Sequence, residues 1–164
     1  IKHFIASTNV NDTIPRYFKN GVFKANKTIQ TISNAMDVSN PSNFVRILEI
    51  FKDFDNLREN MSSYSFNDVE TLDLIKKVYD SKGYVLDPHG AVGLLGLNKY
   101  LKINSEDIGV FLETAHPIKF SKHVENILKI KLKKPEKINN ILSKSKEFID
   151  VEDYKDFKEK MLKL

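Results

Sequence analysis

The chain has 164 residues, of which 41% are hydrophobic and 29% charged, and its net charge at pH 7 is +4. This composition indicates a folded domain of ordinary size and excludes an intrinsically disordered chain. No apolar run approaches the roughly 20 residues that span a bilayer, and the lack of cysteine excludes disulfides and thiolate metal sites. We therefore expect a cytoplasmic protein without membrane contact.

The excess positive charge lies in the last part of the chain. Residues 121–164 contain 12 Lys against 8 acidic side chains, whereas the charges of residues 1–120 balance. A basic tail can bind nucleic acid. However, these lysines are interleaved with Glu and Asp, Arg is absent, and aromatic residues do not alternate with the basic ones. The pattern favours a solvated helical face, and we expect no nucleic-acid partner.

The first 32 residues predict one buried strand and one short helix. Residues 3–8 are an apolar run that ends in small and polar residues, which is typical of a buried parallel strand. Asp12 can cap the helix that follows, Pro15 fits its first turn, and Gly21 ends it. Residues 28–32 form a β-rich run.

Residues 33–46 (SNAMDVSNPSNFVR) are the least generic part of the sequence. Asn40 can act as an N-cap, Pro41 suits the first helical position, and apolar residues follow from Phe44, which predicts a helix over 41–54. A helix start directs free N–H groups and the positive end of the helix dipole at one spot, which suits a phosphate or carboxylate. A well-capped buried helix with no ligand is the alternative.

The rest of the chain continues the alternation of turns and helices. In chain order we expect a loop or short helical piece (55–66), a helix (68–81), a short extended segment (84–86), a helix (88–101), a strand (108–113), a helix after Pro117 to about residue 129, and a Lys-rich amphipathic helical region from Pro135. All five prolines fall where a helix should start. The repeated strand–turn–helix pattern predicts an α/β layered fold, in which ligands bind at the carboxyl ends of the strands.

The predicted helix over 88–101 carries Gly90, Gly93 and Gly96 at intervals of three residues. Each glycine costs about 1 kcal/mol of helix propensity relative to alanine. The stripe indicates close approach by another backbone or a flat ligand, and helix–sheet packing is the favoured explanation. His89 and His116 have no second ligand at metal-binding spacing, so we expect no metal site. A Ser–His–Asp order is also missing.

Four runs of the sequence resemble the threonine synthase family, in the family's order: FIASTNVNDTIPRYF (4–18), SNAMDVSNPSNFVR (33–46), GYVLDPHGAVG (83–93) and TAHPIKF (114–120). Members of the family use pyridoxal 5′-phosphate to convert O-phosphohomoserine and water to L-threonine and phosphate. The resemblance covers most of residues 1–130 and only the carboxyl-terminal part of the family. One departure is Ser39, where the family pattern implies glycine.

The resemblance implies that part of the catalytic machinery lies upstream. Family members carry a Ser-Phe-Lys-Asp type motif, whose lysine forms the Schiff base with the cofactor, and a glycine-rich loop for the cofactor phosphate. Neither occurs in these 164 residues. The resemblance therefore implies an enzyme fragment that holds no catalytic lysine and does not turn over alone.

The resemblance also implies functional roles for several residues. Thr114 resembles the hydroxyl that pairs with the pyridine nitrogen of the cofactor. Asp87, His89 and Gly90 match a helix start that faces the cofactor. The candidates for substrate contact are Asn34, Asp37, Asn40, Ser42, Asn43, Arg46, His116 and Lys119. Among them, Arg46 and the helix start at Asn40 are expected to hold the leaving phosphate.

The implied fold is α/β, a three-layer open sheet flanked by helices, as in the carboxyl-terminal part of fold-type II pyridoxal-phosphate enzymes such as the tryptophan synthase β subunit. Residues 1–130 would belong to the large catalytic domain and 131–164 to its helical tail, with three or four strands in all. Exposed sheet edges make self-association of the isolated chain an expectation. The alternatives are another fold-type II lyase, such as a dehydratase, and a non-catalytic binding module.

Overall fold

The computed structural model describes residues 1–142 and 144–163. These residues form two compact units, Ile1–Leu132 and Lys133–Leu164. The second unit contains helices α7 (Glu136–Leu142) and α8 (Tyr154–Met161). The first unit contains the sheet, the remaining helices and both apolar clusters.

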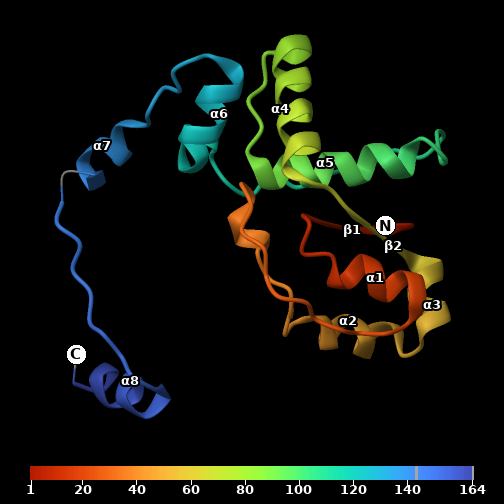
Figure 1. Cartoon of the computed structure of the whole chain (residues 1–164), viewed down its shortest axis with the longest axis horizontal. Coiled ribbons are helices and arrows are strands. Elements are labelled where there is room, and N and C mark those ends of the chain that lie inside the picture. Colours follow the sequence, from red (N-terminus) through yellow and green to blue (C-terminus); the bar gives the residue numbers. More distant parts are fainter. Residues whose placement is uncertain (143, 164) are drawn as a thin grey trace. The chain divides into compact units, whose positions relative to one another are not determined.

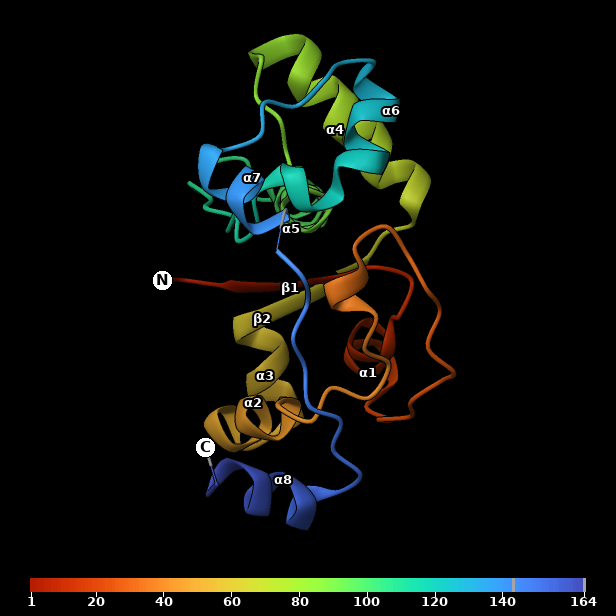
Figure 2. The ribbon, with the colours of Figure 1, turned by 90° about the vertical axis from the view of Figure 1, so that its left-hand side faces the viewer.

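The centre of the first unit is a parallel pair of strands, β1 (Phe4–Thr8) and β2 (Met61–Ser65). Helix α5 (Pro88–Leu101) packs on one face of the pair, and α1 (Thr13–Asn20) with α3 (Phe54–Asn60) covers the other (Figure 2). The expected α/β fold with helices flanking a sheet is therefore confirmed. The strand predicted for residues 3–8 forms over Phe4–Thr8 and is parallel, but it is half-buried and not buried, and Phe4 is exposed.

Two apolar clusters hold these layers together. Helices α4 (Asp68–Lys82), α5 and α6 (Ser121–Leu128) enclose the first cluster, in which Ile75, Leu86 and Val124 are fully buried (Figure 1). Helices α1, α2 (Phe44–Phe51) and α3 form the second, around Leu57. Two 3₁₀ turns, η1 (Asn34–Met36) and η2 (Pro117–Phe120), connect these parts.

Local signals explain most helix ends. Helix α1 stops at Gly21, and α4 stops at Gly83, both in the left-handed conformation that glycine adopts without strain. Helix α4 starts with a capping box, in which the side chain of Asn67 accepts the N–H of Glu70 and the side chain of Glu70 accepts the N–H of Asn67. The helices predicted over 68–81 and 88–101 are confirmed.

The helix predicted over 41–54 is wrong in both its start and its continuity. Residues 41–43 form a turn, so α2 begins only at Phe44, and neither Asn40 nor Asn43 caps it through its side chain. Lys52 then takes a positive φ of 67° and ends α2. Asp53 caps the separate helix α3 by accepting the N–H of Asn56.

The expected number of strands is also wrong, because the described part of the chain contains two. Residues 55–66 hold α3 and β2, not a loop or a short helical piece alone, whereas 28–32 and 108–113 form no strand. Residues 108–113 run along α5, with Gly109 against the side chain of Leu97 and Phe111 beside Gly93, and Val110 is 84% exposed. A strand needs a ladder partner, and no backbone hydrogen bond within the described residues supplies one to this segment.

The glycine stripe of α5 packs as expected at Gly96, where a Cβ would overlap Ser7 of β1. We therefore expect Gly96→Ala to lower the free energy of unfolding by about 1 to 3 kcal/mol, because the added methyl group forces α5 away from the sheet. Gly93→Ala is the matched control, since the nearest atom to its Cβ, in Phe111, lies 3.9 Å away. That control should gain up to about 1 kcal/mol from helix propensity. Urea denaturation followed by circular dichroism measures the free energy of unfolding of both variants. If both substitutions changed it in the same direction, the packing explanation would be contradicted.

Candidate ligand-binding site

The first unit contains one cavity whose lining brings distant parts of the chain together. Its volume is about 480 Å³, within the usual range for small-molecule sites. Three segments meet there: the turn η1, the start of α5, and the loop that leads into η2. The lining residues are Asn34, Ala35, His89, Thr114, Ala115, Lys119 and Phe120.

Asp87 organises the start of α5 behind this cavity. Its side chain is completely buried and caps the helix by accepting the N–H of His89 at 2.8 Å and the N–H of Gly90 at 3.4 Å. Pro88 occupies the first helical position, where no N–H is needed. Burial opposes ionisation of Asp87, but the hydrogen bonds with His89 and Glu113 outweigh it and lower the pKa of this carboxyl group.

His89 connects the start of α5 to the opposite wall of the cavity. Its Nδ1 lies 2.7 Å from Oδ1 of Asp87, and its Nε2 accepts the N–H of Ala35 at 3.1 Å. Since Nε2 accepts a hydrogen bond, the ring proton lies on Nδ1 and is donated to the Asp87 carboxylate. Phe120 lies against the imidazole, with ring centroids 4.8 Å apart. The ring is therefore held in one orientation and one tautomer.

Glu113 reaches the same helix start from the extended segment before Thr114. Its Oε1 accepts the backbone N–H of Asp87 at 2.7 Å, and its Oε2 is buried without a partner among the described residues. Burial, followed by the hydrogen bond and repulsion of the Asp87 carboxylate, raises the pKa of Glu113 to about 7. The Asp87 N–H opposes this shift without cancelling it.

A buried polar network holds the opposite wall, the turn η1. Nδ2 of Asn9 donates to Thr31 Oγ1 at 2.8 Å and to Asp37 Oδ1 at 2.9 Å, and Oδ1 of Asn9 accepts the N–H of Asn11 at 3.0 Å. Asp37 also accepts the N–H of Thr31. These bonds fix the two ends of the loop that contains η1, and so they position Ala35 opposite His89.

Ser39 belongs to the same network. It is buried, its hydroxyl donates to Asn11 Oδ1 at 3.1 Å, and its carbonyl oxygen accepts the hydroxyl of Thr13 at 2.6 Å. The backbone of Ser39 does not take a positive φ. Serine therefore fits this position, which the family pattern gives to glycine.

Four of the residues predicted from the sequence line the cavity: Asn34, His89, Thr114 and Lys119. Asp87 and Gly90 lie directly behind them in the first turn of α5. His116 instead caps η2 by accepting the N–H of Ile118. Asp37 is used inside the polar network. Asn40, Ser42, Asn43 and Arg46 are exposed and do not line the cavity.

Sequence reasoning missed Ala35, Ala115 and Phe120 of the lining, and Glu113 behind it. Ala35 contributes its backbone N–H, which no side-chain pattern indicates. Glu113 ends the segment for which the sequence predicts a strand. A charged residue in such a segment was the one available signal, because buried carboxyl groups require partners.

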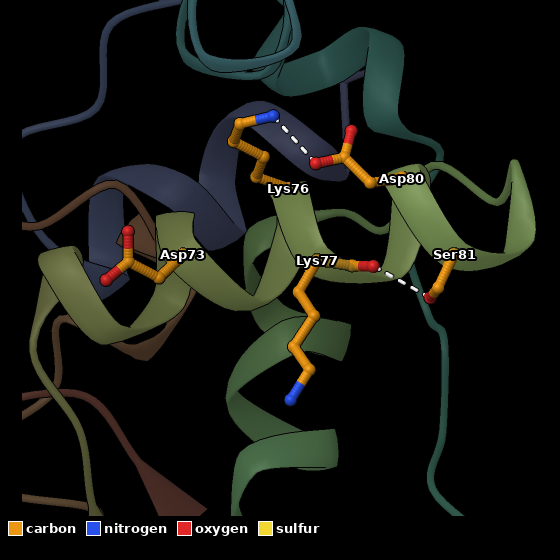
Figure 3. A pocket seen from close by; sticks show the side chains of 5 residues that line it. All are labelled: Asp73, Lys76, Lys77, Asp80 and Ser81. Atoms are coloured by element: carbon orange, nitrogen blue, oxygen red, sulfur yellow. Dashed lines mark hydrogen bonds and ion pairs between the residues drawn. The ribbon is translucent and has the colours of Figure 1, made fainter.

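A second hollow lies on the surface of α4 and is lined by Asp73, Lys76, Lys77, Asp80 and Ser81 (Figure 3). All five belong to one helix, and Lys76 pairs with Asp80 at 2.7 Å. A pair spaced i,i+4 on an exposed face contributes a few tenths of a kcal/mol to the helix. We interpret this hollow as a solvated helix surface.

Within residues 1–142 and 144–163, no three His, Asp or Glu side chains are grouped so that they could hold a metal ion. In the same ranges, none of the helices has the length and apolar character of a membrane span.

The sequence is similar to those of known threonine synthases. Residues 90–160 match the family model described as "Threonine synthase, C-terminal". The chain is 46% identical over 139 residues to a threonine synthase of Haemophilus influenzae, covering 85% of this chain and 32% of that protein. It is 43% identical over 129 residues to the threonine synthase of Escherichia coli, covering 78% of this chain and 29% of that protein. The chain thus spans about a third of the length of these relatives.

The fold is also similar to those of solved threonine synthase structures. The crystal structure of threonine synthase from Escherichia coli superposes with a TM-score of 0.78 at 37% identity, over 85% of this chain and 32% of that one. A threonine synthase from Brucella melitensis with bound PLP superposes with a TM-score of 0.77 at 25% identity, over 90% of this chain and 37% of that one. The arrangement of the two strands and their helices is therefore that of the corresponding part of these enzymes.

Proposed function

Because the chain belongs, over the part that it spans, to the threonine synthase family, we propose that it forms the carboxyl-terminal part of a lyase that uses pyridoxal 5′-phosphate. The reaction proposed is the conversion of O-phosphohomoserine and water to L-threonine and phosphate. The single observation that carries the proposal furthest is the cavity at the start of α5, which collects four residues named by the family motifs.

The chemistry of the cavity fits such a cofactor. Asn34, Thr114 and Lys119 line it, and none of their side chains makes a hydrogen bond within the part of the chain that the structure describes. Their donors and acceptors are therefore available to a ligand. A hydroxyl, an amide and an ammonium group around about 480 Å³ suit a flat polar molecule with negative charge.

Each lining residue has a distinct proposed role. The Thr114 hydroxyl would pair with the ring nitrogen of the cofactor, and a neutral partner of this kind leaves that nitrogen without a proton. Lys119 would attract the negatively charged substrate, and Asn34 would orient it. Pyridoxal phosphate itself supplies, when bound, an electron sink for elimination and replacement at substrate carbon atoms. His89, held by Asp87, would present a neutral imidazole edge to the cavity wall.

The remaining residues of the family motifs are proposed to act outside this cavity. Asn40, Ser42, Asn43 and Arg46 lie exposed around the start of α2. We propose that they contact the substrate phosphate in the complete enzyme, with Arg46 as a bidentate donor. The motif with the catalytic lysine is absent from these 164 residues, so the isolated chain is not expected to release phosphate.

The role of Thr114 is tested in a chimera, in which this chain replaces the matching third of Escherichia coli threonine synthase. We expect the chimera to release phosphate from O-phosphohomoserine. Thr114→Val should lower kcat about five- to tenfold, because one hydrogen bond contributes about 1 to 1.5 kcal/mol. Thr114→Ser, which keeps the hydroxyl, is the matched control and should stay within about threefold of the parent.

The assay separates the proposed reaction from its alternatives. Release of ammonia from serine or threonine in place of phosphate would identify a dehydratase and overturn the substrate assignment. A chimera that binds pyridoxal phosphate, seen by its absorbance, but reacts with neither substrate would contradict the proposed activity. Equal kcat values for Thr114→Val and Thr114→Ser would contradict the role of the hydroxyl.

A further inference from the structure

The segment 108–112 (IGVFL), here called the edge segment, carries an apolar face that nothing in the described part of the chain covers. Phe111 lies beside α5, whereas Ile108, Val110 and Leu112 are 98%, 84% and 75% exposed. This alternation is that of an extended backbone, in which neighbouring side chains point to opposite faces. Neighbouring exposed apolar side chains mark an interaction surface. The edge segment therefore has one covered face and one open face.

Strand β1 has an open edge as well, because β2 occupies only one of its two edges. The carbonyl oxygen of Thr8 accepts the N–H of Phe66, so Thr8 directs its backbone groups at β2. Successive residues of a parallel strand direct their backbone groups to alternate edges. Ile5 and Ser7 therefore direct theirs at the edge away from β2, where the described residues provide no backbone partner.

Helix α5 lies against both of these edges. It contacts β1 at Gly96 and the edge segment at Gly93, where Phe111 is the neighbour. The two edges also begin near each other, since Lys2 before β1 pairs with Asp107 before the edge segment at 3.1 Å. No backbone hydrogen bond among the described residues joins them. Each edge thus offers backbone donors and acceptors that a further strand could satisfy.

The length of the relatives indicates what occupies these edges. The chain spans about a third of the threonine synthases that it matches, and its family model is described as "Threonine synthase, C-terminal". Most of the length of those enzymes therefore lies in an amino-terminal part that is not represented here. A strand from that part would be covered by α5 on one face, so we expect it to be apolar.

A second copy of the chain fits the edge segment less well, because acidic residues flank this segment at both ends. Glu106 and Asp107 precede it, and Glu113 follows it. Antiparallel pairing of two edge segments would set Glu113 of one copy beside Asp107 of the other. Parallel pairing would set each acidic residue beside its own counterpart. Like charges opposite each other destabilise paired strands.

We propose that the open edge of β1 and the edge segment form one docking surface, which accepts an apolar parallel β-strand from the amino-terminal part of a threonine synthase. This strand bonds to the backbone of Ile5 and Ser7 on one side and to the edge segment on the other. Apolar side chains of the same part cover Ile108, Val110 and Leu112. The inference rests on the proposed function only in making the chain part of that enzyme, because it concerns assembly and not catalysis.

The test compares amide hydrogen exchange in the 164-residue chain and in the full-length chimera, in which this chain replaces the matching third of Escherichia coli threonine synthase. In the chain alone, the amides of Ile5, Ser7 and the edge segment should exchange within about tenfold of the unfolded rate. In the chimera, those of Ile5, Ser7 and alternate residues of the edge segment should slow by about 100-fold or more. Ala6, which faces β2, is the internal reference and should be protected in both proteins.

Val110→Lys tests the apolar face of the docking surface. Val110 is exposed in the chain alone, so the substitution should leave amide exchange in the chain unchanged. In the chimera, the buried ammonium group should remove most of the protection of the edge segment. Val69→Lys is the matched control, because Val69 is exposed at the start of α4 between Asp68 and Glu70, and it should leave exchange in both proteins unchanged.

Three results would overturn the proposal. The first is a chimera in which the amides of Ile5, Ser7 and the edge segment stay unprotected, whether or not its other parts fold. The second is equal exchange in the Val110→Lys and Val69→Lys chimeras. The third is protection of these amides in the chain alone that grows with its concentration, which would identify a second copy as the occupant. A chimera that protects these amides but releases no phosphate would contradict only the proposed reaction.

Discussion

Asp87→Ala is expected to lower the free energy of unfolding of the chain by about 2 to 4 kcal/mol. Loss of a helix cap costs about 1 kcal/mol. Here the loss also leaves the Nδ1–H of His89 without its acceptor in a buried site, and an orphaned buried donor costs about 1 to 3 kcal/mol. Urea denaturation followed by circular dichroism measures the change.

Asp53→Ala is the matched control for this prediction. Asp53 caps α3 in the same way, with its side chain accepting the N–H of Asn56 at 2.8 Å, but it is exposed and holds no second group. Water replaces the lost acceptor at an exposed cap, so we expect a loss of about 0.5 to 1 kcal/mol. Equal losses in the two variants would show that burial and the imidazole add nothing to the role of Asp87.

The sequence predicts the helices well where their ends carry side-chain signals. Asp87-Pro88 marks the start of α5, Asn67 or Asp68 marks the start of α4, and Gly21 marks the end of α1, and the structure has all three. These signals act through hydrogen bonds or backbone freedom within a few residues. They therefore do not depend on the rest of the fold.

The errors occur where tertiary contacts decide the structure. The break between α2 and α3 falls at Lys52, an ordinary exposed residue with a positive φ and neither Gly nor Pro beside it. Strand β2 has the sequence MSSYS, which lacks apolar alternation and becomes a strand by pairing with β1. Residues 108–113 have the composition of a strand but no partner among the described residues. Pairing between distant segments is not encoded in local composition.

In the candidate site too, some residues could be predicted from the sequence and others could not. The site roles of Asp87, His89, Thr114 and Lys119 are predicted by family resemblance, and the structure brings these residues to one place. Glu113 meets Asp87 across 26 positions of sequence, so no local pattern could reveal the contact. The roles proposed for Asn40, Ser42, Asn43 and Arg46 stay predictions, because these residues lie outside the cavity.

Asn9→Ala tests whether the polar network positions the wall of the cavity. Asn9 is 1% exposed, and its loss leaves Asp37 Oδ1 and the N–H of Asn11 each without one partner. Several hydrogen bonds in a buried site are removed together, so we expect a loss of about 2 to 4 kcal/mol in urea denaturation. Asn98→Ala is the matched control, because that side chain is exposed on α5, and it should stay within about 0.5 kcal/mol.

Hydrogen exchange separates a local effect from a global one. The network fixes the loop around η1, and this loop places the N–H of Ala35 on Nε2 of His89 at 3.1 Å. In Asn9→Ala, the amide of Ala35 should therefore exchange faster by a larger factor than the amides of the core helix α4. Uniform acceleration of both would mean that Asn9 only stabilises the unit as a whole. Unchanged exchange at Ala35 would mean that its hydrogen bond to His89 forms without support from the polar network around Asn9.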